Sequence, residues 1–391
     1  MKIGIVLSNP PGYSETFFNL KIKGLQANGM EVVLFVQKDV ENFNLCKTII
    51  SPKVYNNPFR QFIASIIIFI SLIPRLKQVI KFIKLERKEK SSFFNIYKKI
   101  YLNSHILKYE LDWLHFGFAT QALGSELVAK AIRAKMAVSF RGFDINVYPV
   151  KHPNCYKQVW KNVDKVHSIS NYLLQKAYTL GLNKKVPYAI ISPAVNFEQL
   201  TNLRPTTYDL RPIIVTIARL NWIKGIDIAI SAMKILKEKG IDFTYKIIGS
   251  GTVKEQERYQ YQLYQLGLKK EVSFLGKLSH SETIQQLNEA IIYLQPSLNE
   301  GFCNAVLEAQ SLGKLCVTSY VGGLPENIEN NKTGWLVLKS NPEALAEKIL
   351  EVIHLPEEEK QLISKNAQQR VRGCFTIEKQ QKQFVEFYNE S

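Results

Sequence analysis

The 391-residue sequence predicts an α/β protein with two doubly wound domains, each a parallel sheet covered by helices. Short apolar, β-branched runs alternate with amphipathic stretches, as expected of parallel strands buried under helices. A polar, proline-bearing stretch at 196–212 separates two such series and predicts a linker. The charge changes there too: residues 1–205 hold 29 basic and 12 acidic side chains, and residues 206–391 hold 22 of each. We therefore place a domain boundary near residue 205.

The elements follow from this alternation, strand by strand and helix by helix. In the first domain we expect strands, each a short apolar run, at 3–7, 31–36, 113–115, 136–139 and 165–168. Helices with apolar residues every three or four positions are expected there at 14–28, 119–134 and 170–180. In the second domain the expected strands are 213–217, 244–248, 272–274, 291–295, 314–318 and 334–337. The helices expected between and after them are 225–239, 255–266, 279–290, 304–312 and 342–353.

Composition excludes several classes of protein. With 46% hydrophobic and 22% charged residues the chain is neither disordered nor collagen-like. Its five cysteines are widely spaced and odd in number, which predicts reduced thiols in a cytoplasmic protein and no zinc site. The N-terminal apolar run is short and stops at a Pro-Pro-Gly turn, so we expect no export signal.

Residues 58–103 interrupt the alternation. About a dozen apolar residues end at Pro74, and a basic amphipathic stretch follows. The run is shorter than the roughly 20 residues that a membrane-spanning helix needs. Two interpretations stay open: a buried helix followed by a solvated one, or a segment in the membrane interface whose cations lie over anionic headgroups. These cations are Arg75, Lys77, Lys81, Lys84, Arg87, Lys88 and Lys90.

The stretch 296–323 carries two carboxylates, Glu300 and Glu308, before and within an expected helix. The free N–H groups at that helix start, on Phe302, Cys303 and Asn304, suit a phosphate or a polarised hydroxyl. A carboxylate there accepts two hydrogen bonds from a diol, as in a ribose or hexose. The alternative is that both glutamates are ordinary solvated groups at a helix end and on a helix face.

Two cations, Arg219 and Lys224, follow the first strand of the second domain. Arginine as a bidentate donor and lysine as a point charge can clamp a diphosphate and stabilise charge on a diphosphate leaving group. Surface solvation is the alternative. Gly249, in a Gly-Ser-Gly turn after the next strand, lacks the full dinucleotide spacing and is a weak signal alone.

In the first domain, three segments follow strands and are expected to line the same cleft. Gly12, in 9–16, permits close approach of a ligand to the backbone. His115 lies in 112–117 and is expected to be either structural or catalytic. Arg141 and Asp144 lie in 139–144.

Together these motifs resemble those of the family 4 retaining glycosyltransferases of the GT-B fold. The resemblance spans nearly the whole chain, and its most specific part is the pairing of E-x7-E (300–308) with ARL…KG (218–225). Further shared motifs are SETF (14–17), LHFG (114–117), RGFD (141–144), GSG (249–251), VSFLGKL (272–278) and GG-x-PE (322–326).

The resemblance implies two Rossmann-like domains facing a central cleft, at 1–205 and 206–374, with a terminal helix at 375–391 crossing back to the first. It implies that the second domain binds a nucleotide-diphosphate sugar and the first binds the acceptor. No cofactor and no metal are expected, because the two cations take the place of a metal. The implied site residues are Glu300, His115, Asp144 and Arg141 for catalysis; Arg219, Lys224 and Gly12 for the diphosphate; Gly301, Phe302, Cys303 and Asn304 for the donor sugar; Glu308, Gly249, Lys277 and Leu275 for the nucleotide; and Tyr13, Ser14 and Glu15 for the acceptor.

One position departs from the family pattern. Many relatives carry histidine where this chain has Arg141, so Arg141 is expected to meet the diphosphate or an acidic acceptor, or His115 to take over the sugar contact, or activity to be lost. The implied function is transfer of a hexose from a UDP- or GDP-sugar to a lipid-linked oligosaccharide or other glycan during surface-polysaccharide synthesis. The expected location is the inner face of the cell membrane, in peripheral contact with anionic lipid. An inactive scaffold and a UDP-sugar epimerase of the same fold are alternatives, and no nucleic-acid partner is expected, since no recognition motif accompanies the basic charge.

Overall fold

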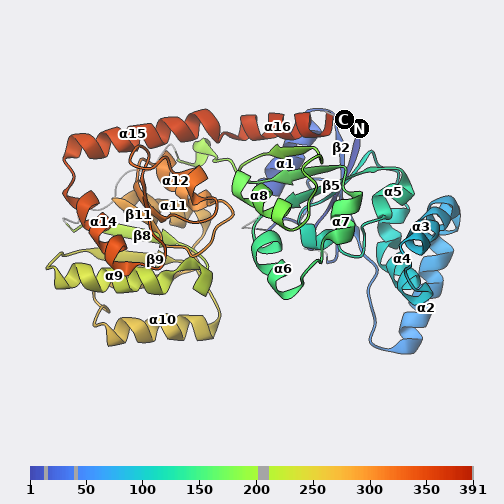
Figure 1. The fold of residues 1–391 in the computed structure, drawn as a ribbon, viewed down its shortest axis with the longest axis horizontal. Coiled ribbons are helices and arrows are strands. Elements are labelled where there is room, and N and C mark those ends of the chain that lie inside the picture. Colours follow the sequence, from blue (N-terminus) through green and yellow to red (C-terminus); the bar gives the residue numbers. More distant parts are fainter. Residues whose placement is uncertain (13–15, 39–42, 201–210, 390–391) are drawn as a thin grey trace. The chain divides into compact units, whose positions relative to one another are not determined.

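The computed structural model describes residues 1–12, 16–38, 43–200 and 211–389. These divide into two compact units, residues 1–191 with 380–391, and residues 192–379. Each unit is one parallel sheet with helices around it (Figure 1). The predicted fold class of two doubly wound α/β domains is confirmed.

Unit 1 is built on a seven-stranded sheet in the order β3-β2-β1-β4-β5-β6-β7. Its strands are β1 (Lys2–Val6), β2 (Glu31–Val36), β3 (Lys47–Ile50), β4 (Trp113–Phe116), β5 (Lys135–Phe140), β6 (Lys165–Ser168) and β7 (Tyr188–Ile190). Its helices are α1 (Thr16–Ala27), α2 (Pro58–Ser71), α3 (Leu76–Lys88), α4 (Phe93–Leu107), α5 (Val128–Ile132), α6 (Tyr148–Lys151), α7 (Lys157–Asn162) and α8 (Asn171–Thr179). The central strands are buried on both faces, so they are nearly continuous apolar runs.

Unit 2 is built on a six-stranded sheet in the order β10-β9-β8-β11-β12-β13. Its strands are β8 (Ile213–Ile217), β9 (Thr244–Ile248), β10 (Val272–Gly276), β11 (Ile292–Gln295), β12 (Leu315–Ser319) and β13 (Trp335–Val337). Its helices are α9 (Ile226–Glu238), α10 (Val253–Gln265), α11 (His280–Glu289), α12 (Asn304–Ser311), α13 (Leu324–Asn327), α14 (Pro342–His354) and α15 (Glu357–Cys374). Side chains cap several of these helices, among them Thr252 at α10 and Asn341 at α14.

The last helix, α16 (Ile377–Asn389), enters unit 1 from Gln380 onward. Phe384, Phe387 and Tyr388 join the apolar core that contains Phe18 and Trp113. The chain therefore returns to the first unit at its end, as the predicted crossing helix requires (Figure 1).

Two details of the expected elements are wrong. The helix expected at 119–134 is a short 3-10 turn (Ala119–Ala122) followed by α5, because Gly124 adopts a φ of +80° and breaks the run. The strands β3 and β7 were not expected at all. The two compact units of the structure meet between Ile191 and Ser192, and Val195 N–H donates to the carbonyl of Phe375 within unit 2.

Candidate functional site

The candidate donor site lies where the connections of the second sheet change direction. From β8 the chain first builds β9 and β10 on one side, then returns to place β11 on the other side. Loops that leave two such neighbouring strands diverge and open a crevice at their carboxyl ends, which is where doubly wound sheets bind ligands. Arg219 and Lys224 follow β8, and Glu300 follows β11.

Lys224 and Glu300 are in direct contact at this edge of the sheet. The Lys224 Nζ atom lies 2.5 Å from Oε1 of Glu300, a residue that is only 9% exposed. The same oxygen accepts hydrogen bonds from Ser297 Oγ at 2.9 Å and Gln295 Nε2 at 3.3 Å. Arg219, which follows β8 as Lys224 does, is exposed to solvent. The structure thus brings together one predicted diphosphate ligand and one predicted catalytic carboxylate.

Two glycines allow the loops at this edge to approach closely. Gly225 has a φ of +63°, and a Cβ there would lie 2.0 Å from the carbonyl oxygen of Pro296. The loops after β8 and β11 are also joined by a hydrogen bond from Leu298 N–H to the Ile223 carbonyl, 2.8 Å long. On the other side, Gly323 N–H donates to the Glu300 carbonyl at 2.9 Å. The backbone that carries Glu300 is therefore fixed from both neighbouring loops.

The start of α12 only partly fits the expected row of free N–H groups. Cys303 N–H donates to Asn327 Oδ1, and Asn327 Nδ2 donates back to the Cys303 carbonyl, both at 3.0 Å. Phe302 and Cys303 are buried, whereas Asn304 is exposed. Burial, with Glu300 nearby, raises the pKa of the Cys303 thiol to about 12, so this thiol stays neutral and is no nucleophile. Cys303 thus anchors the start of the helix. Its N–H group, one of the three expected to face a ligand, is already bonded within the protein.

The predicted nucleotide residues lie at the same edge of the sheet. Gly249 follows β9 with a φ of +138°, and a Cβ there would lie 1.9 Å from the Ala218 carbonyl oxygen. Leu275 is in β10, and Lys277 directly follows that strand. Glu308 accepts a hydrogen bond from His280 Nε2 at 3.0 Å.

His280 is a candidate functional residue that the sequence analysis missed. The hydrogen bond to Glu308 raises the pKa of His280 above its ordinary value. The helix that His280 begins was predicted, but the histidine is 28 residues from Glu308 and on another element, so no spacing pattern connected the two.

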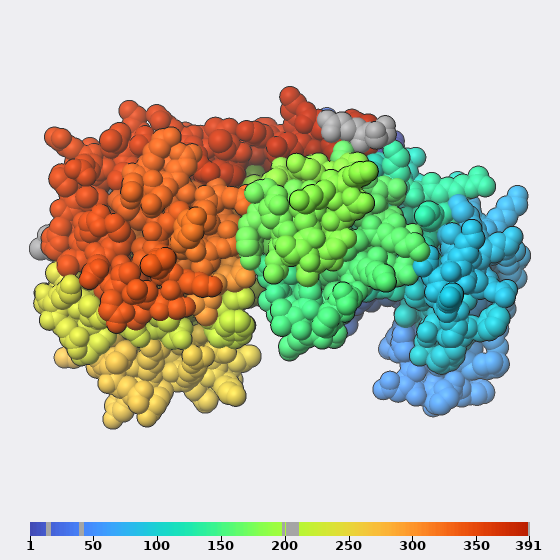
Figure 2. Space-filling model, in the orientation of Figure 1, coloured from blue at the N-terminus to red at the C-terminus, as the bar shows by residue number. Residues whose placement is uncertain are grey.

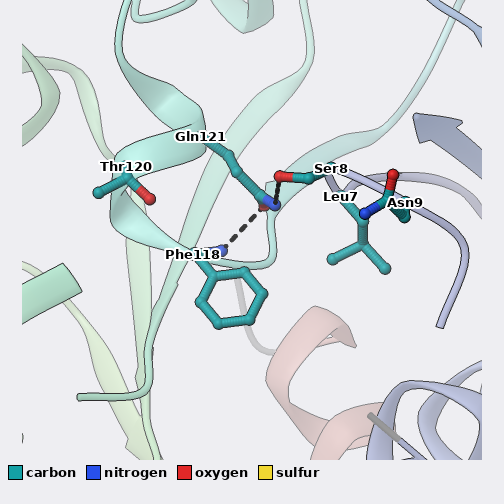
Figure 3. A pocket seen from close by; sticks show the side chains of 6 residues that line it. All are labelled: Leu7, Ser8, Asn9, Phe118, Thr120 and Gln121. Carbon is teal, nitrogen blue, oxygen red and sulfur yellow. Dashed lines mark hydrogen bonds between the residues drawn. The ribbon is translucent and has the colours of Figure 1, made fainter. Parts of the chain in front are cut away.

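Unit 1 has its own crevice at the equivalent place in its sheet, between β1 and β4. A hollow of about 230 Å³ is lined there by Leu7, Ser8, Asn9, Phe118, Thr120 and Gln121. Gln121 closes one side of it: its Nε2 donates to Ser8 Oγ at 3.2 Å and its Oε1 accepts from Phe118 N–H at 3.1 Å (Figure 3). The hollow therefore presents hydroxyl and amide groups on a partly apolar wall. None of these six residues was a predicted site residue.

His115 is fully buried and bonded through both ring nitrogens. Nδ1 lies 2.6 Å from Tyr388 Oη and 3.2 Å from Lys21 Nζ, and Nε2 lies 2.7 Å from Ser139 Oγ. Burial, with the charge of Lys21 nearby, lowers its pKa well below the ordinary value. These contacts favour the structural alternative for His115, because both ring nitrogens are already bonded within the protein.

Asp144 and Arg141 organise the loop after β5. The Asp144 carboxylate accepts hydrogen bonds from the N–H groups of Arg141, Gly142 and Ala119, at 2.9–3.0 Å. Burial raises the pKa of Asp144. The Arg141 guanidinium lies over the ring of Phe17, 3.4 Å from its centroid, in a cation–π contact.

The remaining predicted residues are less defined. Tyr13, Ser14 and Glu15 lie outside the described residues. Gly12 has open space where a Cβ would be, so no close approach within the protein requires glycine there. Among the described residues, no cluster of three or more His, Cys, Asp or Glu side chains is placed to hold a metal ion.

Comparisons with known proteins agree with the motifs. Residues 204–370 match the model of the family "Glycosyl transferases group 1". WcaL of Escherichia coli (strain K12), named as a colanic acid biosynthesis glycosyltransferase, is 29% identical over 270 residues, which are 67% of this chain and 66% of WcaL. The aligned part thus spans just under two thirds of that relative.

Two solved structures share the fold. A glycosyltransferase from Rickettsia africae ESF-5 has a TM-score of 0.73 at 21% identity, covering 100% of this chain and 98% of its own. HepE of Anabaena, solved with UDP and glucose, has a TM-score of 0.74 at 16% identity and covers all of both chains. The predicted resemblance is confirmed at the level of the matched part: residues 204–370, which include the Arg219, Lys224, Glu300 and Glu308 motifs, match the glycosyl transferases group 1 family, and the chain has the GT-B fold.

Proposed function

We propose that this protein is a retaining glycosyltransferase that moves a hexose from a UDP- or GDP-sugar to a lipid-linked glycan in surface-polysaccharide synthesis. The observation that carries the proposal is the Lys224–Glu300 pair at the switch point of the second sheet. It places a cation and a buried carboxylate where a doubly wound sheet binds a nucleotide.

In this proposal Arg219 and Lys224 bind the donor diphosphate and neutralise the charge that develops on it as the leaving group, without a metal. Glu300, already bonded to Ser297 and Gln295, meets the donor sugar. Glu308 accepts hydrogen bonds from the ribose diol, and the segment of Leu275 and Lys277 flanks the base.

The reaction breaks the bond between the anomeric carbon and the diphosphate oxygen. The acceptor oxygen forms its bond to that carbon on the same face, and its proton passes to the departing phosphate oxygen. Retention follows because entry and departure share one face. The protein contributes charge stabilisation and positioning of the two substrates.

We propose that the acceptor binds at the β1–β4 crevice of unit 1. Its hydroxyl and amide groups, on Ser8, Asn9, Thr120 and Gln121, match the donors and acceptors of a sugar. Asp144 and His115 act as positioning residues for the loops and for α16. Arg141, stacked on Phe17, occupies the position of the family histidine.

The biological setting of the proposal is argued from similar proteins and from the positive charge of residues 1–205. WcaL is named for colanic acid biosynthesis, and HepE was solved with UDP and glucose. A surface polysaccharide and a UDP-sugar are therefore the first choices for this chain. The entire excess of 17 positive charges resides in residues 1–205, which favours peripheral contact with an anionic leaflet that carries a lipid-linked acceptor.

Calorimetric titration with UDP, GDP and their hexose conjugates, in EDTA, tests the donor site. We expect one nucleotide to bind the wild type, and Arg219→Ala and Glu308→Ala to weaken it by tenfold or more while leaving the fold intact. Glu347→Ala, an exposed glutamate of α14, is the matched control. Wild-type affinity in both variants would refute the site assignment. No binding of any nucleotide by folded wild type would favour the inactive-scaffold alternative.

A further inference from the structure

An uncovered apolar surface runs along α2 and α3 of unit 1. Phe59, the first aromatic residue of α2, is 71% exposed, and the row of large apolar side chains behind it is also exposed. At the start of α4, Phe93 and Phe94 are 76% and 63% exposed. The exposed apolar side chains are Phe59, Phe62, Ile63, Ile66, Ile67, Ile70, Ile73, Leu76, Ile80, Phe93 and Phe94, and we call them the apolar face. A patch of this kind on a folded protein marks an interaction surface.

The opposite side of α2 is firmly held, so the exposure is not that of a loose helix. Ser65 is buried; its Oγ donates to the Gln61 carbonyl at 2.8 Å and accepts from Tyr97 Oη at 2.6 Å. The rings of Phe69 and Tyr97 stack with centroids 5.3 Å apart. Asn57 caps the start of α2 through hydrogen bonds from two N–H groups. In Figure 2 the light-blue atoms of α2 form the outer edge of unit 1.

The exposed charges of α3, beside the apolar face, have one sign. The acids of α3 and its end point inward: Glu86, 1% exposed, pairs with Lys99 at 2.9 Å, and Glu89 pairs with Lys161 at 2.6 Å. The exposed charged residues of α3 are all cations: Lys77, Lys84, Arg87 and Lys88. Glu110, the exposed acid near the start of α3, is paired with Arg75. A row of cations next to inserted apolar side chains is complementary to anionic lipid headgroups.

The lengths of α2 and α3 and the bend between them indicate contact with a single leaflet of a membrane. No single helix among the described residues is long and apolar enough to cross a membrane, whereas α2 and residues 73–88 pass that test together but bend by 52°. At about 1.5 Å per residue, the 14 residues of α2 extend about 21 Å, less than the roughly 30 Å of hydrocarbon. The cations of α3 cannot enter that hydrocarbon, so both helices fit along its surface.

We infer that the apolar face and the cations of α3 dock this protein onto an anionic bilayer, with α2 and α3 lying in the interface of one leaflet. This inference deepens the membrane contact of the proposed function by naming the helices that insert and the lipid charge that they require. A second copy of the chain is a poorer occupant: a two-fold contact through this face would bring the cations of α3 near their equivalents.

Co-sedimentation with vesicles of phosphatidylcholine, with and without phosphatidylglycerol, tests the inference. The wild type should bind the anionic vesicles and bind the neutral ones weakly. Ile66→Gln with Ile70→Gln should lower partitioning about tenfold per side chain. Lys84→Gln with Arg87→Gln should lower binding to anionic vesicles about fivefold per charge. Val253→Gln with Leu362→Gln, two similarly exposed apolar residues of unit 2, should bind like the wild type.

Circular dichroism on each variant confirms folding, and sedimentation velocity gives the oligomeric state. Equal vesicle binding by the wild type and the Ile66, Ile70 double variant would overturn the inference, as would a wild type that binds neither vesicle. A wild-type dimer that the double variant dissociates would show instead that the face is a subunit interface. Nucleotide titration of the same samples separates the two proposals, since a failed donor site leaves vesicle binding unchanged.

Discussion

Replacement of Gly323 by alanine tests how tightly the donor-site loops are packed. Gly323 has φ −87° and ψ 2°, which alanine adopts without strain, so only the added methyl group matters. That Cβ would lie 2.0 Å from the carbonyl oxygen of Gly301, whereas ordinary contact begins at 3.4 Å. The segment that carries Glu300 must therefore move by more than about 1 Å, and a misplacement of this size costs on the order of 100-fold in rate. Overpacking of this kind also costs about 1–3 kcal/mol of unfolding free energy.

The assay combines urea unfolding with transfer from the nucleotide sugar that the wild type binds. Gly373→Ala is the control, because Gly373 lies within α15 and a Cβ there meets nothing within 4 Å. Alanine at that helical position should be neutral or stabilise by up to about 1 kcal/mol. If Gly323→Ala unfolds and turns over like Gly373→Ala, the close approach of the two loops does not constrain the site, and the argument from Gly323 fails.

Two further predictions concern buried or paired side chains. The pKa of His280 is raised by Glu308, so the stability from this pair is present below the ordinary value of 6.5 and is lost as pH rises through the raised pKa. Urea unfolding across pH should show that loss in the wild type and not in His280→Gln; equal pH profiles would contradict the pairing. Tyr388→Phe removes the hydroxyl 2.6 Å from His115 Nδ1 and should cost about 1–2 kcal/mol in urea unfolding. Tyr264→Phe, at an exposed tyrosine, should cost almost nothing, and equal losses would show that the buried hydroxyl adds no stability.

The sequence predicted the central strands because burial on both faces makes them apolar throughout. β3 and β7 were missed because they are short edge strands of the first sheet, four and three residues long, and no residue in either is fully buried. The helix expected at 119–134 failed at Gly124, because glycine adopts the positive φ that ends the run at little cost and the apolar periodicity around it does not show this.

In the candidate site, too, some features could be predicted from the sequence and others could not. Arg219, Lys224 and Glu300 were predictable because the carboxyl ends of neighbouring parallel strands share one edge of a sheet. The pairing of Glu308 with His280, and the lining of the hollow by Ser8 and Gln121, depend on side-chain geometry between separate elements. No local pattern encodes such contacts.

The proton positions around His115 can be derived from the Ile191 carbonyl, which lies at one end of the hydrogen-bond network of this histidine. The Ile191 carbonyl can only accept, so His167 Nε2, 3.0 Å away, carries a proton, and a neutral His167 must accept at Nδ1. Ser139 Oγ, 2.7 Å from that nitrogen, then donates to it and must itself accept from His115 Nε2. This leaves His115 Nδ1 as the acceptor for Tyr388.

Tyr388, His115, Ser139 and His167 thus each have an acceptor for their proton, with Lys21 Nζ as a second neighbour of His115 Nδ1 at 3.2 Å. Both imidazoles are neutral, in agreement with the lowered pKa values that burial gives them. A substrate that contacted His115 would have to break a buried bond to α16 or to β5. The histidine of the LHFG motif therefore contacts the C-terminal helix through Tyr388, and we expect any effect of its replacement on transfer to pass through the position of α16.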